Sequence, residues 1–196
     1  MFGITNTTDQ ATSFLKELGL PEEHLTANFK LLADTDNRYL RDLKINVNNA
    51  LNAETLSKKE AYLLAYSVAV NDKKEVLKHA FYQSALAEGA TEKELAEVLA
   101  CTSLLNANNV YYRFRHFMND ETYNNTQAGI RMSIMANPVL GKEFFELTSL
   151  VISALNGCEL CVTSHEKALL NHGTTKQRIH DSIRIGAVIR SLAVIV

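Results

Sequence analysis

Residues 156–172, NGCELCVTSHEKALLNH, decide how the rest of the chain is interpreted, because they hold two of the three cysteines and two of the six histidines. Cys158, Cys161 and His165 are spaced so that an α-helix places them within roughly 60° of one another on one face. Good helix formers follow His165, and Gly173 is a natural C-terminal stop. The stretch therefore predicts a helix that carries two thiols and an imidazole on a single face.

Three interpretations of the cysteine pair are open. Cys158 and Cys161 could simply fill a core, because a free cysteine behaves as a small hydrophobic residue. They could bind zinc, although structural zinc usually gathers two separated ligand pairs and the chain has no second Cys-x-x-Cys. They could also form a redox dithiol, whose thiolate gains from the dipole and free amides of a helix start. The spacing favours the redox dithiol, and we expect Cys101, which has no partner, to be buried.

The composition of the whole chain is that of a globular protein. Its 196 residues suit one domain, and 46% hydrophobic with 21% charged residues is ordinary for such a domain. A formal net charge of −2 excludes a basic field for nucleic acid. The apolar run IGAVIRSLAVIV at 185–196 is too short to cross a bilayer, and MFGITNTTDQ at 1–10 lacks the pattern of a signal peptide. We therefore expect a cytoplasmic protein that binds neither nucleic acid nor membrane. In that reducing compartment a cysteine pair is more often catalytic than structural.

Apolar residues recur at helical spacing along most of the chain, and the alternating pattern of strands is absent. Residues 38–51 show the helical pattern, and Ser57 with Glu60 predicts a capping box for a long apolar helix that ends near Val70. A thioredoxin carries its Cys-x-x-Cys after a strand, and this chain offers no such strand. The sequence therefore predicts an all-α protein.

An internal repeat divides this all-α chain into two helical units. Residues 67–99 match residues 149–183 at an offset of about 85, with a slip of one residue before Gly89 and Gly173. We expect a single domain, residues 1–196, with a degenerate repeat at about 58–100 and a catalytic repeat at about 142–196. The first copy has Lys73 and Val76 in place of Cys158 and Cys161, and Ala80 or Phe81 in place of His165. Packing therefore does not require thiols at these positions, which favours a chemical role for the cysteines of the second copy.

The predicted helix before the reactive one supplies a carboxylate. Glu146 lies on a polar stripe of the mostly apolar residues 142–155. If the chain reverses at the Asn-Gly pair 156–157, Glu146 lies roughly 15 Å back along one helix and His165 roughly 10 Å along the next. A carboxylate beside an imidazole fixes its tautomer. The spacing thus predicts a relay of Glu146, His165 and Cys161, with Cys158 beside it.

With these residues in place, the chain resembles the AhpD-like alkylhydroperoxidases of the carboxymuconolactone decarboxylase superfamily. The resemblance runs from about Leu104 to Leu192 and is carried by NNVYYRFRHF, GIRMSIMANP and FELTSLVISALNGCELCVTSHEKALLNHG. It implies an all-helical homotrimer without a bound cofactor that reduces organic hydroperoxides as an antioxidant defence. It also implies re-reduction through lipoyl groups, by dihydrolipoamide, a lipoylated protein or another dithiol.

The resemblance implies a role for each residue of the site. Cys161 would attack the peroxide and carry the sulfenic acid, Cys158 would resolve it as a disulfide between the two, and Glu146 with His165 would relay protons. One departure is plain: many members of the family have a histidine directly before the second cysteine, and this chain has Leu160. The helix dipole, in contrast to the family assignment, favours Cys158 as the more acidic thiol.

Two other functions stay open, a general thiol–disulfide oxidoreductase and a non-enzymatic redox or metal-binding module. We expect the aromatic and basic cluster at 104–118 to serve the core and subunit contacts. Because the cluster matches the family, it could also form a wall of the active site, although the sequence assigns no role to any one of its residues.

Overall fold

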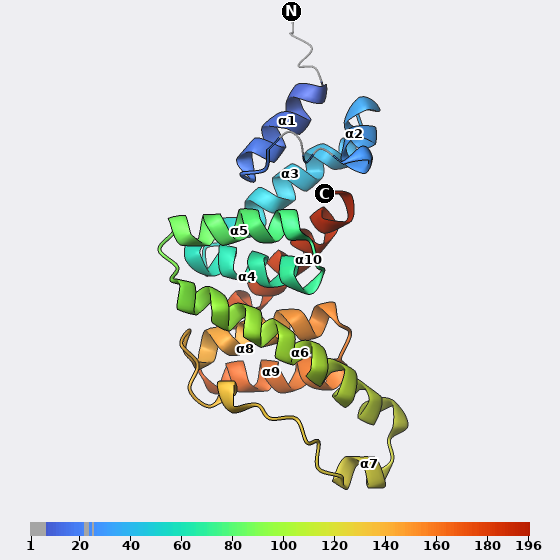
Figure 1. Cartoon of the computed structure of the whole chain (residues 1–196), viewed down its shortest axis with the longest axis vertical. Coiled ribbons are helices and arrows are strands. Elements are labelled where there is room, and N and C mark those ends of the chain that lie inside the picture. Colours follow the sequence, from blue (N-terminus) through green and yellow to red (C-terminus); the bar gives the residue numbers. More distant parts are fainter. Residues whose placement is uncertain (1–6, 22–23, 25) are drawn as a thin grey trace, which may run out of the picture.

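The computed structural model describes residues 7–21, 24 and 26–196, and within these ranges the chain forms helices and turns without a strand (Figure 1). The prediction of an all-α protein is confirmed. Residues 1–6, which include most of the segment used to predict a missing signal peptide, lie outside the described ranges. No helix of the described part is both long and apolar enough to cross a membrane. The elements are α1 (Thr7–Glu17), α2 (Ala27–Asp34), α3 (Arg38–Leu51), α4 (Lys58–Asn71), α5 (Glu75–Ala87), α6 (Glu92–Met118), α7 (Glu121–Asn125), the short 3-10 helix η2 (Ser133–Met135), α8 (Lys142–Leu155), α9 (Glu159–Asn171) and α10 (Lys176–Ile195).

The helices form an elongated stack, with α1, α2 and α3 at one end and α7 at the other (Figure 1). α4 packs against α5, and α8 packs against α9. The long helix α6 contacts α4, α8 and α9, while α10 contacts α3, α4 and α8. α6 and α10 thus join the two helix pairs, and the reactive stretch lies at the junction of α8 and α9.

The helices α4, α5 and α6 correspond to α8, α9 and α10 at a constant spacing along the sequence. Each helix of the second set begins 84 residues after its counterpart, at 142 against 58, 159 against 75 and 176 against 92. Gly89 and Gly173 have φ angles of +85° and +83°, and the side chains of Thr91 and Thr175 cap the helices that follow. We therefore propose that the single domain, residues 1–196, contains two related helical units, at about 58–100 and about 142–196.

The helix starts align the two units at an offset of 84 residues. The sequence comparison paired Cys158 with Lys73, an offset of 85, so the two registers differ by one residue. No slip is needed, because Lys73 and Gly157 both take a positive φ, of 57° and 68°, at the same point of the turn. In the first unit, Leu77 and Phe81 are buried in the core. At the offset of 84, Cys158 corresponds to Lys74 and Cys161 corresponds to Leu77, in place of the expected Lys73 and Val76. His165 corresponds to Phe81, one of the two residues expected there.

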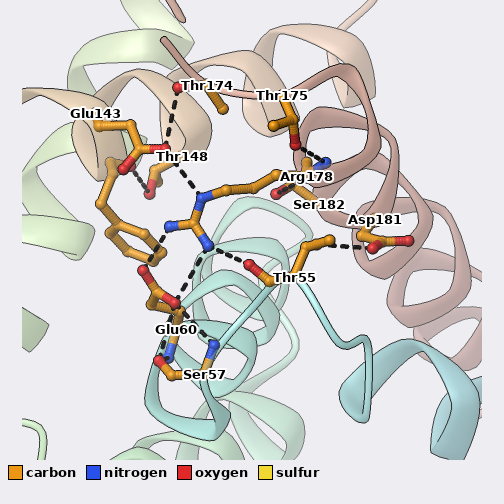
Figure 2. Close-up of polar contacts among 11 residues, drawn as sticks. Thr55, Ser57, Glu60, Glu143, Thr148, Thr174, Thr175, Arg178, Asp181 and Ser182 are labelled. Atoms are coloured by element: carbon orange, nitrogen blue, oxygen red, sulfur yellow. Dashed lines mark hydrogen bonds and ion pairs between the residues drawn. The ribbon is translucent and has the colours of Figure 1, made fainter. Parts of the chain in front are cut away.

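A largely buried arginine ties together the starts of α4, α8 and α10 (Figure 2). Nη2 of Arg178 lies 2.6 Å from a carboxylate oxygen of Glu60, its Nε lies 3.0 Å from one of Glu143, and its Nη1 donates to the carbonyl of Thr55. Burial alone lowers the pKa of Arg178, but the two carboxylates outweigh burial and raise this pKa above its usual value. Because Glu146 lies one turn after Glu143 on α8, the network holds the helix that carries the carboxylate of the predicted site.

The carboxylate of Glu60 makes this network sensitive to acid. Burial alone raises the pKa of Glu60, whereas hydrogen bonds from Arg178 and from the backbone N–H of Ser57 outweigh it and lower this pKa below its usual value of 4.5. A carboxyl group with a lower pKa in the folded state than in the unfolded state stabilises the fold above its unfolded pKa. That stabilisation is lost as the pH falls from about 4.5 through the folded value.

Replacing Arg178 with methionine should lower the free energy of unfolding at pH 7 by about 2–4 kcal/mol, because Glu60 and Glu143 lose their shared cation in a partly buried place. Urea unfolding followed by circular dichroism measures the loss. Lys78→Met, which removes an ion pair with Glu75 at the surface, is the matched control and should cost less than about 1 kcal/mol. Equal losses in the two variants would contradict the structural role of Arg178.

Candidate active site

The cysteine pair begins at a turn that ends α8 and starts α9. The backbone N–H of Gly157 donates to the carbonyl of Ala154, and that of Cys158 donates to the carbonyl of Ser153, each at 3.1 Å. This pattern, with Gly157 in the left-handed region, is a Schellman motif. Cys158 is also the N-cap of α9, and its sulfur accepts a hydrogen bond of 3.3 Å from the backbone N–H of Cys161. One residue therefore completes both helix ends.

Cys158 and Cys161 are joined by a disulfide, and their Cα atoms are 5.3 Å apart. The two cysteines differ in access, since Cys158 is 0% exposed and Cys161 is 7% exposed. Only Cys161 contributes to the wall of the neighbouring pocket. The sulfur of Cys158 is thus fully buried, whereas a small molecule in the pocket can approach the sulfur of Cys161.

Glu146 and His165 lie in contact, as their spacing predicted. Nδ1 of His165 is 2.6 Å from a carboxylate oxygen of Glu146, and both side chains are largely buried between α8 and α9. A carboxylate that accepts the Nδ1 proton leaves Nε2 of the imidazole as an acceptor. His165 therefore presents a proton-accepting nitrogen away from Glu146.

A pocket of about 260 Å³ opens over Cys161 and His165. α9 forms one side of it, α6 forms another, and the segment that includes η2 closes the third. Most of the side chains that line it are apolar, which suits a small organic molecule. The lining residues are Leu105, Asn108, Tyr112, Met132, Met135, Leu160, Cys161, Ser164 and His165.

The α6 wall of the pocket contains a buried amide. Nδ2 of Asn108 donates to the sulfur of Met132 at 3.2 Å, while its Oδ1 is buried and has no hydrogen-bond partner among the described residues. Leu160, the residue directly before Cys161, is 42% exposed and lies at the pocket. The 104–118 cluster, which we expected to serve mainly the core and subunit contacts, thus contributes Leu105, Asn108 and Tyr112 to this site.

The third cysteine lies apart from the disulfide. Cys101 is a free thiol, 1% exposed, with its sulfur 3.5 Å from the hydroxyl oxygen of Ser149. Burial, opposed by that hydrogen bond and assisted by the charges of Glu97 and Glu146, raises the pKa of Cys101 to about 12. Cys101 packs with Leu105, Phe145 and Ile152 in a small cluster between α6 and α8. The expectation of a buried residue is confirmed.

Several pocket residues were not found from the sequence. Met132, Met135 and Ser164 carry no spacing that marks them as part of a site, and the first two come from an irregular segment. The available hint was that both methionines fall within GIRMSIMANP, one of the segments that resemble the family. Among the residues that the structure describes, no three His, Cys, Asp or Glu side chains gather in a way that could hold a metal.

Comparisons with known proteins identify relatives that align with most of this all-α chain. The family model described as "Carboxymuconolactone decarboxylase family" matches residues 122–195. A protein of Beijerinckia indica named alkyl hydroperoxide reductase AhpD is 38% identical over 156 residues, which are 80% of this chain and 86% of that protein. A protein of the same name from Coxiella burnetii is 39% identical over 158 residues, or 79% and 89% of the two chains. Another from Rhizorhabdus wittichii is 35% identical over 177 residues, or 86% and 96%. The chain belongs to the carboxymuconolactone decarboxylase family, among its AhpD-like members.

The reduced native protein should react rapidly with two equivalents of a thiol reagent, because Cys161 forms a mixed disulfide first and the adjacent Cys158 then displaces it, whereas Cys101 should stay protected. With a pKa of about 12, Cys101 is almost entirely protonated at pH 8 as well as buried, so a thiol reagent should modify it only after unfolding. Titration with Ellman's reagent before and after denaturation gives the two counts. The variant Cys101→Ala should keep both fast thiols, and a third fast thiol in the native parent protein would contradict the assignment.

Proposed function

We propose that this protein is a peroxidase that reduces alkyl hydroperoxides with the thiols of Cys158 and Cys161. The observation that carries the proposal is that the accessible cysteine, Cys161, shares a pocket with His165, whose other ring nitrogen is held by Glu146. The relatives that are named alkyl hydroperoxide reductase support the same class of reaction.

The first step is an attack by the thiolate of Cys161 on the outer oxygen of the hydroperoxide. A sulfur–oxygen bond forms, the oxygen–oxygen bond breaks, and Cys161 becomes a sulfenic acid while the peroxide is reduced to an alcohol. His165 takes the thiol proton through Nε2 and returns a proton to the leaving alkoxide. Glu146 holds the imidazole in the tautomer that this exchange needs.

The second step closes the disulfide. The sulfur of Cys158 attacks the sulfenic sulfur of Cys161, a sulfur–sulfur bond forms, and the hydroxyl group leaves as water with the proton of the Cys158 thiol. The disulfide between these two residues corresponds to the product of this step. A dithiol, which we propose to be dihydrolipoamide or a lipoylated protein, then returns two electrons and restores both thiols.

The pocket supports an organic substrate over hydrogen peroxide. Leu105, Met132 and Leu160 surround the approach to Cys161 with apolar surface, which favours the alkyl group of a hydroperoxide. Leu160 also leaves the proton exchange to His165 alone, without the second histidine that many members of the family have. We propose that a water molecule or the substrate itself carries the proton between Cys161 and His165 where a second histidine would otherwise take part.

We also propose a homotrimer in the cytoplasm. The support is the family resemblance together with exposed apolar side chains along the end of α6 and on α7, a surface that a second copy of the chain could cover. These residues are Val110, Phe114, Phe117, Met118 and Tyr123.

A general thiol–disulfide oxidoreductase is the second candidate, and the absence of the second histidine favours it. The decisive assay follows consumption of an organic hydroperoxide with dihydrolipoamide as the electron donor. Consumption that depends on both reagents supports the peroxidase. Reduction of a model disulfide without peroxide consumption would replace the peroxidase with the oxidoreductase, and zinc in the purified protein would favour a metal-binding module.

The two cysteines should fail in different ways when each is replaced by serine. Cys161→Ser should abolish peroxide consumption, because the attacking sulfur is gone. Cys158→Ser should complete one turnover and stop at a sulfenic acid on Cys161 that dimedone traps, since no thiol remains to resolve it. Mass spectrometry of the trapped peptide identifies the labelled residue. Normal turnover by Cys158→Ser, or a dimedone label on Cys158 in Cys161→Ser, would reverse the two roles.

Glu146→Gln should slow peroxide consumption by roughly ten- to a thousandfold without abolishing it, the usual contribution of a proton-transfer group. Glutamine keeps the shape and can still contact Nδ1 of His165, but it does not stabilise an imidazolium. Stopped-flow measurement of the reaction with excess hydroperoxide gives the rate of the first step. Glu166→Gln, which changes a carboxylate next to His165 in the sequence but outside the pocket, is the control and should leave the rate unchanged.

A further inference from the structure

Four asparagines form a continuous chain of amide hydrogen bonds that passes through the turn before Cys158 and ends at Ser153 on α8. Nδ2 of Asn106 donates to Oδ1 of Asn71 at 2.9 Å, and Nδ2 of Asn71 donates to Oδ1 of Asn156 at 3.2 Å. Nδ2 of Asn156 donates to Oδ1 of Asn109 at 3.0 Å, and Nδ2 of Asn109 donates to the hydroxyl of Ser153 at 2.9 Å. The bonds all run in one direction and join α4, α6, the turn and α8.

This amide chain reaches the backbone of Cys158 through two of its members. Asn156 is the first residue of the turn, and the carbonyl of Ser153 accepts the backbone N–H of Cys158. Two arginines complete the support from either side. Nη1 of Arg113 donates to the carbonyl of Asn156 at 2.5 Å, and Nη1 of Arg190 donates to the carbonyl of Leu155 at 2.6 Å.

The inner end of the amide chain is costly to interrupt. Asn109 and Ser153 are almost fully buried, and each polar atom of the Asn109 amide has a partner. A buried amide that loses its partner is destabilised by more than the bond itself contributed in the folded state. Asn156 therefore has one strongly preferred place, between Asn71 and Asn109, and the turn has one preferred shape.

We infer that the amide chain positions Cys158 for disulfide formation, which makes Asn71, Asn109 and Asn156 positioning residues of the redox pair. The chain of bonds is complete in the structure that contains the disulfide. When the disulfide is reduced, the two sulfur atoms must move apart to non-bonded distance, so the dithiol form permits a looser turn than the disulfide form. A turn that is held in place therefore raises the effective concentration of one sulfur at the other. The inference rests on the proposed redox use of the pair, but not on peroxide as the oxidant.

The test is the equilibrium between dithiol and disulfide in buffers of reduced and oxidised dithiothreitol. Asn156→Ala removes both amide bonds of the turn, and Asn71→Ala removes one of them from outside the turn. Each variant should lower the equilibrium constant for forming the disulfide by about three- to tenfold, the effect expected from a net loss of one hydrogen bond. Acid quenching, alkylation and mass spectrometry count the free thiols.

The control is Asn48→Ala, which removes the 2.6 Å bond that Nδ2 of Asn52, the C-cap residue of α3, donates to Oδ1 of Asn48, away from the cysteines. It should leave the equilibrium constant within about twofold of the parent value. Constants within twofold of the parent in both Asn156→Ala and Asn71→Ala would overturn the inference, and so would an equal shift in the control. If one variant loses its helical circular dichroism signal, the other decides.

This equilibrium needs no peroxide, so it separates the inference from the proposed function. A protein that consumes no hydroperoxide, yet whose Asn156→Ala variant shifts the equilibrium, loses the peroxidase proposal and keeps the positioning role. With hydroperoxide present, Asn156→Ala should also accumulate more sulfenic acid on Cys161, because closure by Cys158 is slower. Unchanged sulfenic acid together with an unchanged equilibrium would overturn the inference.

Discussion

Cys158 caps the end of α8 and the start of α9, and the geometry of the site depends on this double role. Its backbone N–H ends α8 by donating to the carbonyl of Ser153, and its sulfur caps α9 by accepting the N–H of Cys161. This double use fixes the angle at which the chain reverses. The reversal in turn brings Glu146 of α8 to His165 of α9. α8 is held at its start by the Arg178 network and at its end by the amide chain, so both ends of the helix are tied to the rest of the fold.

Burial and the helix dipole act in opposite ways on the two sulfurs. Cys158 is nearer to the start of α9, where a negative charge gains typically less than about 1 kcal/mol from the dipole at an exposed site. It is also fully buried, and an unpaired charge in an apolar place costs far more than the dipole returns. Cys161 keeps contact with the pocket and lies one turn from the imidazole. Access thus supports Cys161 as the attacking sulfur, where an argument from the dipole alone favours Cys158.

Local features of the fold could be predicted from the sequence, whereas features that depend on packing between distant segments could not. The capping box of Ser57 and Glu60 forms as predicted, because its partners are three residues apart. The Glu146–His165 contact also follows from spacing, since only one turn separates the two helices. Met132 of the pocket comes from an irregular segment whose position depends on long-range contacts. The register expected between the two units, with Lys73 at the position of Cys158, differs by one residue from the register of the helix starts; Asn71 and Asn156, which lie 85 residues apart, bond to each other and do not occupy equivalent places.

The two helical units show what the site requires beyond a helical scaffold. At the spacing of 84 residues, Glu146 and His165 of the second unit correspond to Tyr62 and Phe81 of the first, which pack in the hydrophobic core. A carboxylate or an imidazole alone at such a position would be destabilising, because a buried polar group without a partner costs about 1–3 kcal/mol or more. Glu146 and His165 satisfy each other's polar groups through their 2.6 Å contact. Either residue alone would lower the stability of the fold. The same contact that makes the pair tolerable in a packed interior also orients the imidazole toward the pocket, and in this way stability and chemistry depend on one interaction.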